Sequence, residues 1–267
     1  MSAAARLEKR VAELQVRAKK SLGQNFLISD SVIDKIISKA LSFKSEKLIE
    51  IGPGCGALTD ILLQHNRNLK LIELDRDLFS FWQEQGCDIV NADALQMNWE
   101  PYADYLLVSN LPYQISSSLV IERSLDLKPL LGMVLMFQKE VAQRIRATHQ
   151  SEHYGMLSII AQEFWTIETV CDAGPRDFKP APKIASRVLC FKPKVSTVKD
   201  PAEFLSFVKI AFQQRRRILK TNLHALGARF DQNKLAEWLG AHQKSEKVRA
   251  EELSVIEINS LYHFLKI

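Results

Sequence analysis

Cysteine is scarce in this sequence, and no apolar run is long. Its 267 residues include four cysteines that stand alone, without the C-x-x-C spacing of zinc sites, so we expect neither disulfide bonds nor a bound metal. No stretch of about 18 apolar residues could span a membrane, and the charged N-terminus lacks the apolar segment of a signal peptide. Internal repeats and low-complexity tracts are also missing. These absences predict a soluble, cytoplasmic protein with no membrane partner.

The composition is that of a globular protein that can bury a full core. Hydrophobic residues make up 46% of the chain, and its length suits one large domain with a smaller one beside it. The formal net charge is +5. Such a charge is compatible with a polyanionic partner but does not require one.

From residue 29 onward, short apolar segments alternate with segments of helical spacing. The expected strands are residues 47–52, 69–74, 87–92, 103–110 and 131–138. The expected helices are residues 30–41, 57–65, 76–85, 116–125 and 139–147. Strands that alternate with single helices form parallel βαβ units, so we predict an α/β fold with a doubly wound, Rossmann-like sheet. Residues 153–173 and 186–193 have strand-like spacing, which predicts antiparallel strands at the sheet edge.

The chain divides into three parts by composition. Residues 1–18 form a charged N-terminal extension, to which the sequence assigns no role. Residues 19–198 contain the alternating strand and helix segments and end in a short polar linker. Residues 199–267 are helix-like throughout, with expected helices at 201–214, 215–226, 232–242 and 255–265. We therefore predict a small all-helical domain at the C-terminus.

A glycine-rich turn and two acidic residues follow three successive strands. Gly52 and Gly54 lie between a strand and a helix, where glycine lets the backbone approach a ligand. Together with Ala57 they also satisfy the dinucleotide fingerprint. Glu73 ends the next strand and can accept hydrogen bonds from ribose hydroxyls, as NAD and S-adenosylmethionine both require. Asp93 follows the third strand, where a carboxylate can accept from an adenine amino group.

The fourth strand ends in the tetrapeptide Asn110-Leu111-Pro112-Tyr113. A tetrapeptide of this type is the signature of methyltransferases that act on exocyclic amino groups. Together with "KKSLGQNFL" at 19–27 and "EIGPGCGALT" at 50–59, it resembles the rRNA adenine-N6 dimethyltransferases, and most of all the bacterial KsgA/RsmA family. Further similar stretches are "FQKEVAQRI", "YGMLSII", "FKPAPKIASRV" and "FQQRRRILKTNL".

The resemblance implies an S-adenosylmethionine-dependent enzyme that dimethylates two adjacent adenines in the 3′-terminal hairpin of 16S rRNA. Its partner would be the small ribosomal subunit during assembly. The fold implied is a Rossmann-like methyltransferase domain followed by a helical domain. By the same resemblance, Asn25 and Leu27 close over the cofactor, and Gly52 approaches its methionine part. Phe178 would stack on the face of the target base opposite Tyr113.

The chemistry of adenine N6 explains why this tetrapeptide suits such a reaction. The lone pair of N6 is delocalised into the ring, so the amine is a poor nucleophile. Two acceptors, the Asn110 side-chain oxygen and the Leu111 carbonyl, would bind its two N–H groups and localise the lone pair. Pro112 stiffens the turn, and Tyr113 offers a stacking face for a base taken out of its helix. Catalysis would then depend mainly on alignment and electrostatics.

Two basic segments fit an RNA partner. Residues 176–194 and 209–220 are rich in lysine and arginine and poor in acidic residues. Such runs are also typical of solvated surfaces, but here they flank an expected nucleobase site. The residues predicted to contact RNA are Lys183, Arg187, Arg215, Arg216 and Arg217.

Three other functions are compatible with parts of the pattern. One is an erythromycin-resistance methyltransferase, which shares the fold and modifies an adenine of large-subunit rRNA. A second is a non-catalytic ribosome-assembly factor, or a protein like the mitochondrial transcription factors B. A dehydrogenase is the third, because of the dinucleotide fingerprint.

Overall fold

The computed structural model describes residues 1–14, 25–65 and 68–266. Packing divides the chain into two compact units. The first unit comprises residues Met1–Ala142 and Thr166–Pro193, and the second comprises Gln143–Trp165 and Lys194–Ile267. The predicted linear boundaries at residues 18 and 198 stay a prediction. The two units are described separately below.

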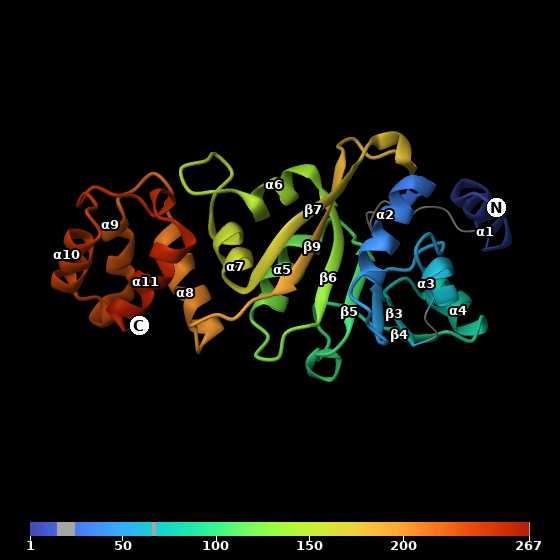
Figure 1. Ribbon diagram of the computed structural model, residues 1–267, viewed down its shortest axis with the longest axis horizontal. Coiled ribbons are helices and arrows are strands. Elements are labelled where there is room, and N and C mark those ends of the chain that lie inside the picture. Colours follow the sequence, from blue (N-terminus) through green and yellow to red (C-terminus); the bar gives the residue numbers. More distant parts are fainter. Residues whose placement is uncertain (15–24, 66–67, 267) are drawn as a thin grey trace. The chain divides into compact units, whose positions relative to one another are not determined.

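A seven-stranded sheet forms the centre of the first unit (Figure 1). Its strands are β2 (Leu48–Ile51), β3 (Leu69–Glu73), β4 (Asp88–Asn91), β5 (Leu106–Asn110), β6 (Gly132–Gln138), β7 (Trp165–Ala173) and β9 (Ser186–Pro193), in the spatial order β4-β3-β2-β5-β6-β9-β7. The pairs β4–β3, β3–β2, β2–β5 and β5–β6 are parallel, whereas β6–β9 is antiparallel. The direction of strand order reverses between β2 and β5. Ligands bind at such a switch point, beyond the carboxyl ends of the strands.

The helices between these strands begin and end close to the expected residues. They are α2 (Asp30–Leu41), α3 (Thr59–His65), α4 (Arg76–Glu84), α5 (Ser116–Ser124) and α6 (Lys139–Arg146). A separate two-stranded sheet pairs β1 (Phe26–Leu27) with β8 (Phe178–Lys179) in the antiparallel direction. The N-terminal residues form a further helix, α1 (Ala3–Leu14). The predicted α/β fold with a doubly wound sheet is therefore confirmed.

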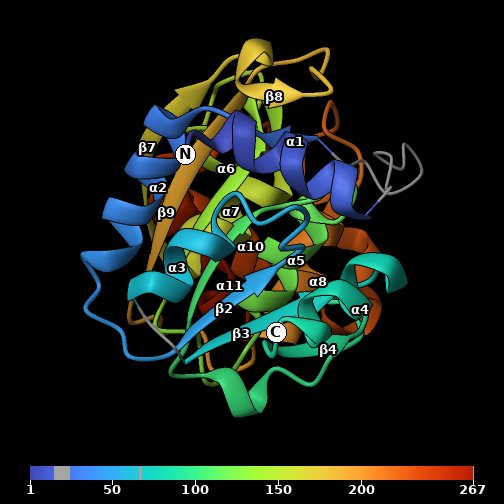
Figure 2. The same ribbon diagram turned by 90° about the vertical axis from the view of Figure 1, so that its right-hand side faces the viewer.

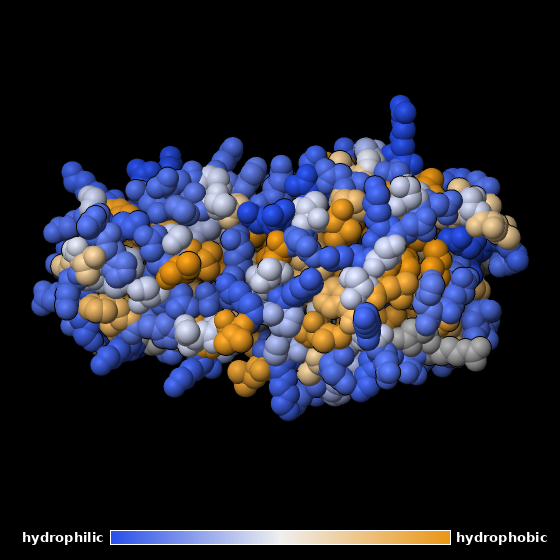
Figure 3. Space-filling model, viewed as in Figure 1, coloured by the Kyte–Doolittle hydropathy of each residue, from blue (hydrophilic) through white to orange (hydrophobic). Residues whose placement is uncertain are grey.

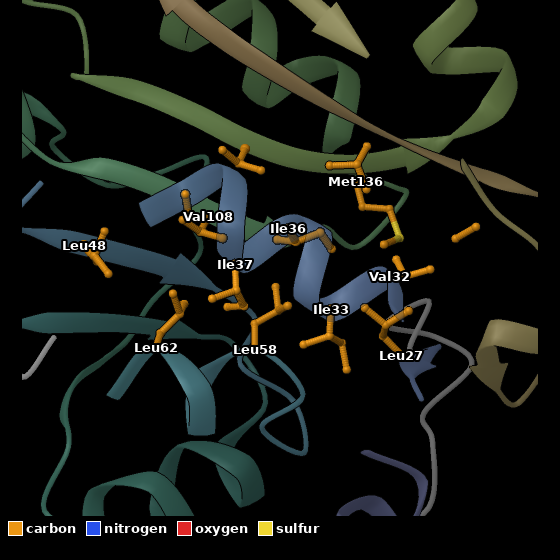
Figure 4. Close-up of a cluster of buried hydrophobic side chains, with 14 of the residues drawn as sticks. Leu27, Val32, Ile33, Ile36, Ile37, Leu48, Leu58, Leu62, Val108 and Met136 are labelled. Atoms are coloured by element: carbon orange, nitrogen blue, oxygen red, sulfur yellow. The ribbon is translucent and has the colours of Figure 1, made fainter. Parts of the chain in front are cut away.

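Apolar side chains at helical spacing on α2 form a large part of the core. Ile33, Ile36 and Ile37 point into a cluster that also contains Leu58 and Val108 (Figure 4). Each of these side chains is almost completely buried. Burial on both faces also explains why the parallel strands have nearly continuous apolar sequences.

The second unit is helical. Its helices are α7 (Met156–Phe164), α8 (Pro201–Phe212), α9 (Leu219–Leu223), α10 (Gln232–Ala241) and α11 (Val255–Leu265). The side chains of Asp200, Asp231 and Ser254 cap α8, α10 and α11 by accepting hydrogen bonds from backbone N–H groups of the first turns. Short polar residues thus mark the helix starts that the sequence predicts.

The prediction of strand structure for residues 153–173 was partly wrong. Trp165–Ala173 is strand β7, but Met156–Phe164 is helix α7, which follows the extended residue Gly155. Residues 157–161 are all buried, so apolar residues occur on every side of this helix. A short apolar run of this kind has no period that distinguishes a helix from a strand.

The three consecutive arginines do not begin a helix, contrary to the prediction. Arg215, Arg216 and Arg217 lie in the turn between α8 and α9, and all three are exposed. Nearby, Asn222 is 1% exposed and donates from Nδ2 to the carbonyls of Ala211 and Gln214, at 2.7 and 3.1 Å. The first bond satisfies a carbonyl in the last turn of α8 and the second a carbonyl just after the helix, so the chain can leave the helix there.

The surface is mixed. Figure 3 shows hydrophilic residues over most of the face drawn, with apolar residues between them. The large apolar side chains that reach the surface include Leu127, Val195 and Ile256, which are far apart in the sequence. Among the described residues, no helix is long and apolar enough to cross a membrane.

Candidate active site

A cavity of about 1230 Å³, including space open to solvent, lies at the carboxyl ends of β2, β3, β4 and β5. The predicted site residues that line it are Asn25, Leu27, Gly52, Gly54, Glu73, Asp93, Asn110, Leu111, Pro112 and Tyr113. The carboxyl ends of parallel strands meet at one sheet edge, so residues from four strand ends converge here. The predicted cofactor residues and the tetrapeptide therefore share one cavity.

The glycine loop after β2 forms one wall of the cavity. Gly52 has a φ of +66°, which favours glycine, and its N–H donates to the Ile72 carbonyl at 2.8 Å. A Cβ atom at this position would lie 3.8 Å from the Pro112 ring. The hydroxyl of Ser109 also donates to the Ile51 carbonyl at 2.5 Å. The loop and the tetrapeptide are thus held against each other.

Glu73 lies at the end of β3 and is 7% exposed. Its Oε1 accepts from the backbone N–H of Asp75 at 2.9 Å. Burial raises the pKa of Glu73 above its ordinary value, although backbone hydrogen bonds partly offset this effect. Asp75 itself caps α4 by accepting from Asp77 N–H at 3.1 Å, and it does not line the cavity. Glu73 is therefore the carboxylate of β3 that a ligand in the cavity can reach.

Asp93 follows β4 and is half-buried. Its Oδ1 accepts from the Leu95 N–H at 2.9 Å, and its Oδ2 accepts from Gln96 at 3.3 Å. These bonds hold the carboxylate in a short turn at the cavity wall. The geometry is suited to a fixed acceptor for a ligand N–H group.

The tetrapeptide is anchored on both sides. Asn110 donates from Nδ2 to the Asn25 carbonyl at 3.1 Å, so its side-chain oxygen is not part of this bond. Among the described residues, no backbone N–H donates to the Leu111 carbonyl. The Tyr113 hydroxyl is hydrogen-bonded to Ser186 at 2.8 Å. Both acceptors expected for an amino group are thus available, beside a ring that is held in position.

Phe178 lies outside the cavity lining. It is 3% exposed, pairs with Leu27 across the β1–β8 sheet and belongs to the same core cluster as α2. Its ring is packed in the core and does not reach the cavity. Stacking of Phe178 on a target base therefore stays a prediction.

Two of the basic residues predicted to contact RNA have acidic partners. Arg187 forms two hydrogen bonds with Asp172, at 2.6 and 2.9 Å, and these lower the pKa of Asp172 to about 2. Arg215 pairs with Glu251 and donates to the Ser151 carbonyl at 3.1 Å. Lys183 is exposed.

Helix α1 contributes cavity residues that the sequence did not predict. Ala3, Arg6 and Leu7 line the cavity. The only sequence signal was the amphipathic spacing of this segment, which left its partner unknown. Helix α1 is thus part of the cavity wall.

Comparison with known proteins identifies the family. The profile described as "Ribosomal RNA adenine dimethylase" matches residues 15–266. The chain belongs to the ribosomal RNA adenine dimethylase family. The resemblance seen in the motifs is therefore confirmed.

Relatives with the name "Ribosomal RNA small subunit methyltransferase A" match almost the whole chain. The protein from Bdellovibrio bacteriovorus is 53% identical over 268 residues, which cover 97% of each chain. That from Desulfitobacterium hafniense is 37% identical and covers 98% of this chain and 97% of its own. This rRNA adenine dimethylase family member is accordingly an enzyme, a methyltransferase.

Solved structures show the same fold at lower identity. A dimethyladenosine transferase from Plasmodium falciparum has a TM-score of 0.71 at 22% identity, covering 90% of this chain and 98% of its own. The 23S rRNA methyltransferase ErmE has a TM-score of 0.67 at 21% identity, covering 91% and 100%. The two have different names and share the fold, so the fold by itself does not distinguish the substrate.

Proposed function

We propose that this adenine dimethylase family member transfers methyl groups from S-adenosylmethionine to the N6 atoms of two adjacent adenines. The substrate is the 3′-terminal hairpin of 16S rRNA in an assembling small subunit, in the cytoplasm. The observation that carries this proposal is the position of Asn110-Leu111-Pro112-Tyr113 in the wall of the cavity that also contains Glu73 and Asp93. The small-subunit name shared by the relatives supports the choice of rRNA.

The residues of the cavity fit S-adenosylmethionine. Glu73 and Asp93 are acceptors at the ends of neighbouring strands, as ribose hydroxyls and an adenine amino group require. Asn25 and Leu27 lie at the cavity wall near the glycine loop. The cofactor supplies an electrophilic methyl group on a sulfonium centre, and its departing group is a neutral thioether.

The protein residues supply alignment. The Asn110 oxygen and the Leu111 carbonyl accept the two N–H groups of adenine N6, which directs its lone pair toward the methyl group. The Asn25 carbonyl holds the Asn110 amide, and Ser186 holds the Tyr113 ring for stacking. Such positioning of reacting groups is worth several kcal/mol of the barrier.

The direct test is methyl transfer to defined rRNA. Purified protein with labelled S-adenosylmethionine should produce N6,N6-dimethyladenosine in small-subunit particles and none in isolated large-subunit rRNA. Labelling of large-subunit rRNA alone would instead support the erythromycin-resistance type of activity. Calorimetry should show binding of S-adenosylhomocysteine, and binding of NADH alone would contradict the choice of cofactor.

Replacing Glu73 by alanine should weaken cofactor binding by roughly 1–3 kcal/mol, the usual cost of losing charge-assisted hydrogen bonds. RNA affinity should stay nearly unchanged, because the carboxylate lies in the cofactor cavity. Calorimetric titration with S-adenosylhomocysteine measures the effect. Asp88→Ala is a suitable control, since Asp88 is exposed and pairs with Lys70 on the surface. If the Glu73 and Asp88 variants bind S-adenosylhomocysteine with equal affinity, Glu73 is not the residue that binds the ribose.

The exposed arginine turn should contribute to rRNA binding through phosphates. Arg216 and Arg217 are exposed, and among the described residues neither forms a salt bridge like that of Arg215. Alanine at either position should reduce the log–log salt slope of particle binding by about 0.7–0.9. Arg215→Ala should mainly lower stability, because Arg215 is paired with Glu251.

Binding measured across a salt series tests this prediction. Arg229→Ala is the matched control in the same unit, since Arg229 pairs with Glu203 at 3.4 Å. If the Arg216 and Arg217 variants keep the wild-type slope, the turn is only a solvated surface. The phosphate contacts would then lie around Lys183 and Arg187.

A further inference from the structure

Helix α1 is attached to the glycine loop through Arg10. Its Nη1 donates to the Cys55 carbonyl at 2.9 Å and to Asp60 at 3.0 Å. The guanidinium also lies over the rings of Phe81 and Trp82. The backbone N–H of Ala3 donates to Asp30 at 2.9 Å. These bonds hold α1 beside the loop that follows β2 (Figure 2).

One turn before Arg10 on this helix, Arg6 faces the cavity. Of the described residues that line the cavity, Arg6 is the only cation, whereas Glu50, Glu73 and Asp93 are acidic. Its Nη1 donates to the Met1 carbonyl at 3.0 Å. Its Nε and Nη2 are buried and have no hydrogen-bond partner in the part of the chain that the structure describes. Buried guanidinium donors are costly when unpaired, so they point to an acceptor that a ligand supplies.

The acidic side chains near Arg6 do not fully balance the positive charge of the two arginines, Arg6 and Arg10. The Oδ2 atom of Asp60 lies 3.7 Å from the Arg6 Nε. Both carboxylate oxygens of Asp60 already accept hydrogen bonds from the Arg10 Nη1. Burial raises the pKa of the Glu50 carboxyl to about 8, so Glu50 is mostly neutral near pH 7. The guanidinium groups of Arg6 and Arg10 therefore share the carboxylate of Asp60 at this end of the site.

We propose that Arg6 binds the carboxylate of the amino-acid tail of S-adenosylmethionine. This inference rests on the proposed function, which supplies the cofactor. Glu73 and Asp93 are the proposed acceptors for the adenosine part of the cofactor. Both are acidic, so neither is suited to bind the carboxylate of the amino-acid tail. A guanidinium presents two parallel N–H groups that match the geometry of a carboxylate. Helix α1 thus completes the cofactor site from outside the sheet.

The test compares two ligands that differ in the tail. S-adenosylhomocysteine has the carboxylate, and 5′-methylthioadenosine lacks the whole amino-acid part. Calorimetry should show that Arg6→Ala weakens binding of S-adenosylhomocysteine roughly 10- to 100-fold, while binding of 5′-methylthioadenosine changes less than about twofold. Lys9→Ala is the matched control, because Lys9 is an exposed cation on the same helix that pairs only with Glu13 among the described residues. It should change neither affinity.

A purely structural role for Arg6 predicts a different result. If the substitution only detached α1 from the glycine loop, the affinities for both ligands would fall by a similar factor. That outcome would overturn the proposal. Unchanged binding of S-adenosylhomocysteine by the variant would overturn it as well. Arg10→Ala provides the comparison, since Arg10 anchors the helix and should weaken both ligands together.

The wild-type protein gives an independent measurement that needs no folded variant. Replacing the ligand carboxylate by a carboxamide should weaken binding about 10- to 100-fold. An equal affinity for acid and amide would contradict a role for Arg6. Failure of the wild-type protein to bind S-adenosylhomocysteine or 5′-methylthioadenosine would instead reject the proposed cofactor.

Discussion

Replacing Asn110 by alanine should reduce single-turnover methyl transfer by at least about 100-fold. The variant should still bind rRNA particles, because the amide lines the cavity and is not on the exposed arginine turn. The physical reason is alignment, since the amide oxygen is one of two acceptors proposed to orient adenine N6. Cofactor affinity should fall to a smaller extent, since the same side chain lines the cavity.

A second strand-end asparagine provides the control for this experiment. Asn91 ends β4 and donates to the Glu73 carbonyl at 2.8 Å, but it does not line the cavity. Asn91→Ala should therefore change the single-turnover rate only a few-fold. Near-wild-type rates for the Asn110 variant at saturating cofactor would refute the alignment role.

Replacing Gly56 by alanine should lower the free energy of unfolding of the first unit by about 2–4 kcal/mol. Gly56 has a φ of +82°, and a Cβ atom there would lie 2.0 Å from the Arg10 Nη1 and 2.9 Å from the Trp82 ring. The new methyl group would thus strain the backbone and displace the guanidinium that anchors α1. Cofactor affinity should fall as well, since the loop and α1 both line the cavity.

Gly86 is a matched control, because it has a φ of +75° but lies in open space. A Cβ atom on Gly86 would meet nothing within 4 Å among the described residues. Gly86→Ala should therefore cost only the backbone strain, about 1 kcal/mol. Urea unfolding and calorimetry with S-adenosylhomocysteine measure both variants. Equal losses of stability at the two positions would show that the close approach of Arg10 and Trp82 is unimportant.

Several features of the site could be predicted from the sequence because they depend on local order. Alternating segments indicate parallel strands, and the carboxyl ends of parallel strands lie at the same sheet edge. Glu73, Asp93 and Asn110 each end or follow such a strand, so their convergence needs no knowledge of the exact strand order. The bounds of α2 were also predicted correctly from its apolar spacing.

Other features depend on contacts that local sequence does not contain. Met156–Phe164 is a helix because it is buried on every side, and a short apolar run does not reveal that surrounding. The turn of Arg215–Arg217 interrupts the helical pattern where Asn222, several residues later, donates to the Ala211 and Gln214 carbonyls. Phe178 is a core residue because strand β8 pairs with β1, which lies far earlier in the chain.

The family, the sheet and the strand-end residues of the proposed methyl-transfer site can all be predicted from the amino-acid sequence. Those features follow from periodicity and from short motifs in which neighbouring residues act together. The position of α1 depends instead on long-range contacts of the folded chain, because Arg10 is hydrogen-bonded to Cys55 and Asp60, 45 and 50 residues later. Such long-range contacts leave no periodic signal. The two buried donors of Arg6 that lack a partner among the described residues became visible only in the folded chain, where they lie at the cavity wall.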